Sequence, residues 1–275
     1  MWRSVVLWVV AVLVTLTSAV WQRTSGPTYP VRGEVTLGGE TVALELTRTH
    51  GGDGDQPVRV RVASPQISGE VAWRHFPTGE PWQILPMQRA GEWLEAALPH
   101  QPPAGKLEYQ VHLVGAGEAA VFPPLPAVTR FKGDVPAAIL APHILLMFTA
   151  MLCSTAAGLR ALVAVGDPRR LAYVTLAVIA VGGFVLGPAV QKYAFDAWWT
   201  GIPFGWDLTD NKTLAAGAAW AWAAWRLRGG RRARWDVVGA ALVTLVVFAI
   251  PHSVWGSQID WSSLPPAGTA TGKAP

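Results

Sequence analysis

The sequence predicts a membrane α-helical bundle of four spans, joined to an extracytoplasmic all-β sandwich and preceded by an N-terminal anchor helix. Three observations carry this prediction. The 275 residues contain five apolar segments, a long stretch of alternating polarity separates the first from the second, and arginines gather between particular pairs of segments. The composition agrees, because only 15% of the residues are charged, against roughly a quarter in an ordinary soluble domain.

The first apolar segment, residues 5–20, carries no charge and follows Arg3. This pattern is typical of a signal peptide or of an uncleaved anchor. The small residues 17–19 form an acceptable cleavage site, whereas Trp21 favours an anchor that ends in the membrane interface. We therefore assign residues 1–21 to a signal anchor or signal peptide, and we favour the anchor.

Residues 22–135 show the period-two alternation of β-strands, bounded by glycine, proline and Asp-Gly turns. The predicted strands cover residues 31–37, 41–46, 58–62, 70–74 and 107–113. Several short strands at this spacing favour a β-sandwich. Tyr109, in the last of them, is a candidate tyrosine corner, which would make the domain similar to immunoglobulin-like and fibronectin-like folds.

Four further apolar segments within residues 136–258 form the predicted bundle. Two of them, residues 137–159 and 171–191, have the roughly 20 apolar residues that a span requires. The other two, residues 213–227 and 237–250, reach spanning length only if their polar flanks enter the interface. Short spans with polar ends predict a recessed polar pocket on one side of the bundle.

The positions of the arginines predict the orientation, because short cytoplasmic loops are rich in Arg and Lys. Arginines lie before the first segment, between the second and third, and between the fourth and fifth. We therefore expect a cell-membrane protein whose N-terminus is cytoplasmic and whose sandwich and C-terminus lie outside. In a bacterium the sandwich would be a periplasmic domain. The net charge of +4 is then a topology signal and not a nucleic-acid surface. Residues 259–275 are predicted to be a disordered outer tail.

Two of the six histidines fall at the predicted outer face. His143 opens the second segment and His252 closes the fifth, and each follows a proline. Ionisable side chains within spans are costly and are therefore functional candidates. The alternative is that each is an interfacial residue with a satisfied hydrogen bond. Because two such histidines share one face, we favour function.

The loop between the third and fourth segments is unusually rich in aromatic residues. Its aromatic members are Tyr193, Phe195, Trp198, Trp199, Phe204 and Trp206. They are either an aromatic belt in the headgroup layer or a stacking platform for a flat ligand. Asp207 and Asp210 follow where the next helix starts, and we expect Thr209 or Asp210 to cap that helix.

The run from Trp198 to Asp207, followed by a helix that contains Trp220, Trp222 and Trp225, resembles the tryptophan-rich WWD segment of the haem-handling proteins of cytochrome c maturation. The order of histidine, two spans, tryptophan-rich loop, two spans and histidine is also similar. The chain departs from that family in tryptophan spacing, in its smaller number of spans and in its sandwich. The resemblance implies haem as cofactor, with His143 and His252 as axial ligands. It also implies that the haem is lined by Trp198, Trp199, Trp206 and Asp207. Tyr193, in the same aromatic loop, is a further candidate cofactor-binding residue.

Two alternatives to haem stay open. His143, Met147 and Met151 share one helix face, and imidazole with thioether ligands suits copper. Otherwise the protein is a non-catalytic membrane scaffold or assembly factor. Under each of these hypotheses the expected partners are the lipid bilayer and a protein that binds the sandwich. The sequence shows no nucleophile elbow and no phosphate loop, so no catalytic residue is assigned and enzymatic activity is left open.

Overall fold

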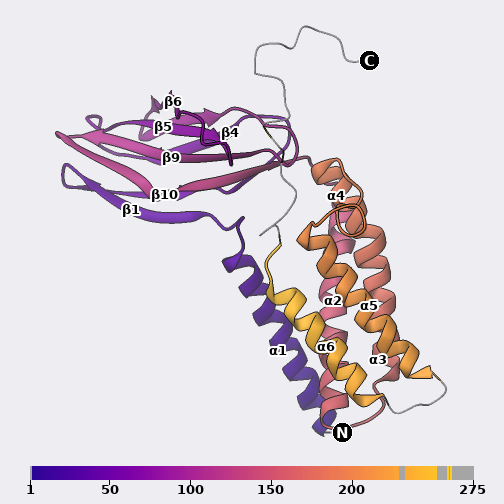
Figure 1. Cartoon of the computed structure of the whole chain (residues 1–275). Helices are drawn as coiled ribbons and strands as arrows, with labels where there is room; N and C mark the ends of the chain where they lie inside the picture. Colours follow the sequence, from indigo (N-terminus) through magenta and orange to yellow (C-terminus); the bar gives the residue numbers. More distant parts are fainter. Residues whose placement is uncertain (1, 229–232, 253–258, 260, 262–275) are drawn as a thin grey trace, which may run out of the picture. The chain divides into compact units, whose positions relative to one another are not determined.

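The computed structural model describes residues 2–228, 233–252, 259 and 261, and the chain divides into two compact units (Figure 1). The helical unit comprises Met1–Tyr29 and Gly133–Ser257. The β unit comprises Pro30–Lys132 and Gln258–Pro275. Residues 262–275, where most of the predicted disordered tail falls, lie outside the described residues.

All five apolar segments form helices in the helical unit. The helices are α1 (Trp2–Ser25), α2 (Ala137–Leu162), α3 (Arg169–Val181), α4 (Gly187–Phe195), α5 (Leu208–Arg226) and α6 (Arg234–Ala249). A π-helical turn, η1 (Gly182–Leu186), joins α3 to α4 without a break in the helix. Such turns widen the helix locally and are frequent at functional sites.

Three helices are long and apolar enough to cross a membrane, so the four predicted spans of the bundle are only partly supported. These helices are α1, α2 and the continuous stretch Arg169–Phe195. The helix α6 has 16 residues, or about 24 Å, which is shorter than the roughly 30 Å hydrocarbon core. The helix α5 has 19 residues but carries charged residues in its first and last turns.

Small side chains let the helices pack closely. A methyl group added at Gly158 of α2 would lie 2.4 Å from the Cβ of Ala241 in α6, so these two backbones approach as in small-residue contacts of membrane helices. Alanines supply most of the remaining core, and Trp220 is its one large ring among the described residues. The helix α1 also joins the bundle, because it contacts both α2 and α6.

The described residues of the β unit form ten strands in three sheets. The strands are β1 (Val31–Leu37), β2 (Glu40–Leu46), β3 (Thr49–Gly51), β4 (Gln56–Arg61), β5 (Ser68–His75), β6 (Gln83–Pro86), β7 (Gln88–Ala90), β8 (Trp93–Leu98), β9 (Lys106–Gly115) and β10 (Glu118–Lys132). The sheet orders are β1-β2, β3-β10-β9-β5-β6 and β4-β8-β7, and β3 runs parallel to β10. The five predicted strands are confirmed, whereas β3, β6, β7, β8 and β10 were not predicted.

One hydrophobic core lies between the three sheets, as a sandwich requires. All three sheets contribute to it, with Leu44 from β2, Val60 from β4 and Val111 from β9 among its buried members. Alternation on β4 places Val58 and Val60 inside and Arg59 and Arg61 outside. The predicted β-sandwich is therefore consistent with the observed β-rich unit.

Tyr109 is buried in this core, but it does not form a tyrosine corner. Its hydroxyl donates to the backbone oxygen of Thr47, 2.7 Å away and 62 residues earlier, whereas a tyrosine corner bonds a few residues upstream. The amide of Gln56 donates to the Thr47 hydroxyl at 2.9 Å, and Thr129 donates to Gln56 at 2.7 Å. Burial raises the pKa of the Tyr109 hydroxyl, so it stays a donor.

Replacement of Tyr109 by Phe is expected to loosen the connection between β2 and β3. The variant keeps the ring but removes the shorter of two hydrogen bonds to the Thr47 oxygen, which still accepts from the Gln56 amide at 3.3 Å. We expect this loss to cost about 1 kcal/mol. Hydrogen–deuterium exchange of the full-length protein should then be faster at residues 46–51. Tyr173→Phe, in α3, is the matched control and should leave these amides unchanged. Equal exchange in both variants would show that the Tyr109 bond contributes nothing.

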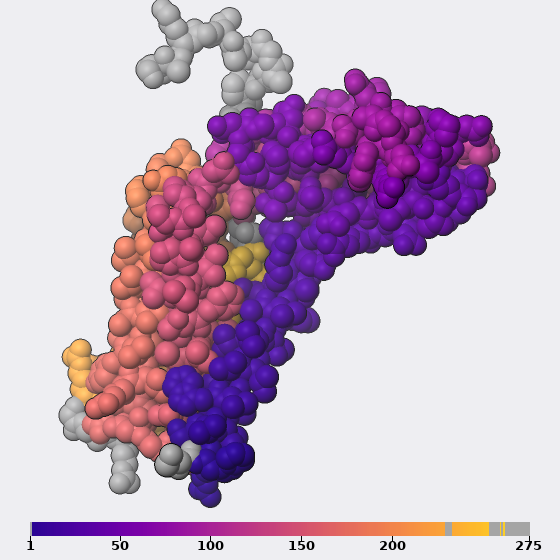
Figure 2. Space-filling model, turned by 180° about the vertical axis from the view of Figure 1, so that it is seen from behind, coloured from indigo at the N-terminus to yellow at the C-terminus, as the bar shows by residue number. Residues whose placement is uncertain are grey.

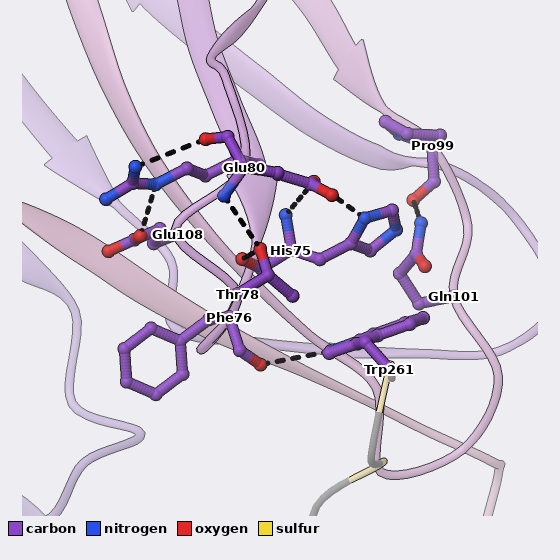
Figure 3. Close-up of polar contacts among 9 residues, drawn as sticks. His75, Phe76, Thr78, Glu80, Pro99, Gln101, Glu108 and Trp261 are labelled. Carbon is purple, nitrogen blue, oxygen red and sulfur yellow. Dashed lines mark hydrogen bonds and ion pairs between the residues drawn. The ribbon is translucent and has the colours of Figure 1, made fainter. Parts of the chain in front are cut away.

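The described part of the C-terminal segment contacts the β unit. Trp261 donates its indole N–H to the oxygen of Phe76 at 3.1 Å, and its ring lies 4.2 Å from that of His75 (Figure 3). A Glu80 oxygen lies 2.8 Å from both the backbone nitrogen and Nδ1 of His75. Trp261 falls within the predicted disordered tail, yet the ring of His75 and the backbone oxygen of Phe76 hold its side chain against the β unit.

Candidate functional site

A cavity of about 310 Å³ lies within the helical unit. Space-filling atoms show a hollow between α1, in indigo, and α2, in pink, with yellow α6 visible inside it (Figure 2). Apolar side chains dominate the lining. The lining residues are Gln22, Leu140, His143, Ile144, Met147, Phe148, Val190, Thr209, Lys212, Thr213, Val247, Phe248 and His252.

The two histidines singled out in the sequence both line this cavity. His143 enters from the second turn of α2, and His252 follows the C-terminal end of α6. They are 109 positions apart in the chain, and the packing of α2 against α6 brings their elements together. The structure thus places both candidate ligands at one site.

His143 is held by the π-helical turn. Its Nδ1 lies 2.9 Å from the backbone oxygen of Gly182, and because a carbonyl only accepts, Nδ1 carries the proton. The lone pair is therefore on Nε2. The ring also lies against Gly187, because a methyl group there would be 3.7 Å from Cε1 of His143, an ordinary van der Waals contact. Histidine ligands of metals usually donate their second ring nitrogen in this way.

The two methionines of the copper alternative lie in different surroundings. Met147, one turn after His143, lines the cavity. Met151 is 1% exposed and packs inside the helical unit, and it does not line the cavity. Of the three residues on this helix face, His143 and Met147 therefore offer donor atoms to the site. His252, from the end of α6, offers a third.

The aromatic loop does not line the cavity. Tyr193, Trp198 and Trp206 are exposed, the last to 84%. Trp199 stacks on Phe184 of η1 with ring centroids 5.9 Å apart, and it donates to a backbone oxygen of its own loop. The predicted wall of tryptophans under the histidines is thus absent from the cavity as the structure describes it. Exposed rings of this kind are typical of a membrane interface.

The acidic residues after the aromatic loop have roles that differ from those expected. Asp207 caps α5 by accepting from the backbone nitrogen of Thr209 at 2.8 Å, so the prediction of Thr209 or Asp210 as cap is wrong. The helix starts at Leu208, earlier than the apolar pattern indicated. Asp210 instead accepts from the backbone nitrogens of Thr200 at 2.6 Å and Gly201 at 3.0 Å.

Asp210 is therefore expected to hold the aromatic loop on α5. Asp210→Ala removes a buried acceptor of two backbone donors, each bond to a charged group contributing about 1.5–3 kcal/mol. Exchange of the Thr200 and Gly201 amides should accelerate by about 10-fold or more. Asp196→Ala, in the same loop but with an exposed side chain, is the control. Unchanged protection in the Asp210 variant would refute this role.

Lys212 is the site residue that the sequence reading missed. In the sequence it belongs to the polar flank of the fourth apolar segment, yet its side chain lines the cavity and the residue is 6% exposed. Its ammonium donates to the backbone oxygen of Ile250 at 2.6 Å. The only sign in the sequence was its position, one turn into a helix that opens with charged residues.

No protein-family model matches the chain, and no curated protein is significantly similar to it. The resemblance to haem-handling proteins thus gains no support from comparison. Among the described residues, no group of three or more His, Cys, Asp or Glu side chains is placed to hold a metal ion. The site offers two imidazoles, one thioether and one ammonium in an apolar cavity.

Proposed function

We propose that the protein is an integral membrane protein that binds haem in this cavity, with His143 and His252 as axial ligands. The observation that carries the proposal is that both imidazoles line one cavity. Haem supplies four nitrogens to its iron, so two side chains complete the ligand set. A metal ion held by protein alone usually needs three or more His, Cys, Asp or Glu ligands, and no such group is found among the described residues. Two histidines therefore suit haem better.

The setting of the cavity supports the same ligand. Leu140, Ile144, Phe148, Val190 and Val247 offer apolar contacts of the kind that a macrocycle needs. The volume of about 310 Å³ is at the lower end of the roughly 300–1,000 Å³ of ligand sites. When bound, haem would supply one-electron redox chemistry, in cytochrome maturation or in a membrane redox role.

Copper is the second candidate, because Met147 and the two histidines line the same cavity and such donors suit Cu(I). The charge of the site opposes it. Lys212 is the charged residue among those lining the cavity, and no Asp or Glu is among them. A bare cation would lie near a like charge in a cavity that no carboxylate lines, although Asp207 interacts electrostatically with Lys212 and His252. Haem, in contrast, brings its own anionic groups.

The proposed topology has α1 as an uncleaved anchor and four spans in the bundle, with the β unit and the C-terminus outside. Contacts within the helical unit show which ends of α1, α2 and α6 lie together. Arg160 donates to Ser4 at 3.0 Å near the N-terminus of α1, and Gln22 donates to the oxygen of Phe248 at 2.8 Å near its C-terminus. The cavity, which Gln22 and Phe248 line, therefore lies at the end of the unit opposite to Arg160. The short basic loops lie at the Arg160 end, which is the predicted cytoplasmic end.

The absorption spectrum of the purified protein tests this proposal. The full chain would be produced in cells supplied with iron and a haem precursor, purified in detergent and measured oxidised and reduced, with metal analysis. We expect a Soret band and about one iron per chain. Copper without a Soret band would support the copper candidate instead. A colourless, metal-free protein would contradict both and leave a scaffold that binds a protein partner through its sandwich.

A further inference from the structure

The strongest unexplained feature of the cavity is its buried lysine. Lys212 is more than nine-tenths buried, and a charged group in such a place is costly unless it is paired. Its ammonium contacts the backbone oxygens of Ile250 at 2.6 Å and Pro251 at 3.5 Å. In the part of the chain that the structure describes, it forms no ion pair with a carboxylate within 4.0 Å. An ammonium has three donors, so one remains beyond these two contacts.

The neighbouring acidic residues accept hydrogen bonds from the backbone. Asp207 accepts from the start of α5, and Asp210 accepts from Thr200 and Gly201. The same helix start adds to the positive potential, because backbone N–H groups at a helix N-terminus favour anions. Thr209 and Thr213, from the first turns of α5, line the cavity beside Lys212. Lys212 thus places an ammonium in one corner of the cavity, where the carboxylate of Asp207 also interacts with it electrostatically.

We infer that Lys212 binds a carboxylate of the ligand in this cavity. The inference rests on the proposed function, and for haem the carboxylate is a propionate. It defines the ligand as an amphipathic molecule with an apolar body, a metal centre that two imidazoles reach and an anionic edge at the start of α5. It also explains why a lysine stands in a lining that is otherwise mainly aliphatic and aromatic.

Titration of the full-length apoprotein in detergent with haem and with haem dimethyl ester tests the inference by absorbance. The two probes differ in the charge of their carboxylates. The wild type should bind haem about 10- to 100-fold more tightly than the ester, which is the range for one hydrogen bond to a charged group. Lys212→Met should reduce this preference to near unity, and Lys212→Arg should keep most of it.

Lys192→Met is the matched control, since Lys192 is half-exposed and pairs with Asp196 in α4. It should keep the wild-type preference. Binding of the ester by Lys212→Met at the wild-type level would show that this variant is folded. Equal affinity of the wild type for haem and its ester, or an unchanged preference in Lys212→Met, would overturn the role of Lys212 alone. Failure of the wild type to bind either probe would overturn the proposed function, and this inference with it.

Discussion

His143→Ala and His252→Ala should each weaken haem binding by at least about 100-fold, which corresponds to about 2.7 kcal/mol. Each change removes one axial ligand from a site that offers two imidazoles, and the cavity has no further histidine among its lining residues. Titration of the detergent-purified apoproteins with haem would give both dissociation constants. The variants should also show altered Soret positions where some haem still binds.

His112→Ala serves as the control, because His112 lies on β9 of the other unit and contacts Glu70 at 3.3 Å. Its haem affinity should equal that of the wild type. If loss of His143 and loss of His112 had the same small effect, the histidines of the cavity would not be ligands. A loss confined to one cavity histidine would indicate a single axial ligand and would contradict bis-histidine ligation.

Trp220→Ala should cause the largest loss of stability among single substitutions in the helical unit, about 3–5 kcal/mol. Trp220 is fully buried, and its indole N–H donates to the hydroxyl of Thr244 at 2.8 Å. That contact joins α5 to α6, the helix that leads to His252. The variant would leave a large cavity among alanines that have no long side chains to fill it. Reversible unfolding in mixed detergent micelles would measure the difference.

Trp222→Ala is a close control, two residues away on the same helix. Its ring is 53% exposed, although its N–H donates to Asp236 at 2.8 Å, so we expect a loss of about 1 kcal/mol. Similar losses in the two variants would contradict the packing described for α5 and α6. The pair also separates structural tryptophans from exposed ones within the tryptophan-rich segment.

Much of the fold could be predicted from local pattern. The helices of the described chain follow from five apolar segments, and five strands follow from alternation. The missed strands lacked that signal, as in β10, where three prolines accompany a shift in register between Phe122 and Ala127. Helix α5 starts earlier than predicted because Asp207 caps it. A hydropathy pattern does not reveal a capping residue.

The site residues at the ends of apolar segments could be predicted from the sequence. Those whose positions depend on tertiary contacts could not. The Pro-His pairs indicated His143 and His252, which line one cavity. The direction of the aromatic side chains depends on a loop that Asp210 fixes from ten residues away, and no local pattern specifies it. Lys212 was missed because a lysine beside an aspartate and an asparagine resembles a solvated helix start.

The most direct test of the central claim is to locate the iron in the haem-loaded protein. Anomalous scattering at the iron absorption edge, or a cryo-electron microscopy map of the protein in detergent, would place it relative to α2 and α6. We predict one iron between the imidazoles of His143 and His252, within the cavity that Met147 and Lys212 also line. Iron bound elsewhere, or a haem-treated protein whose cavity holds no iron, would contradict the claim.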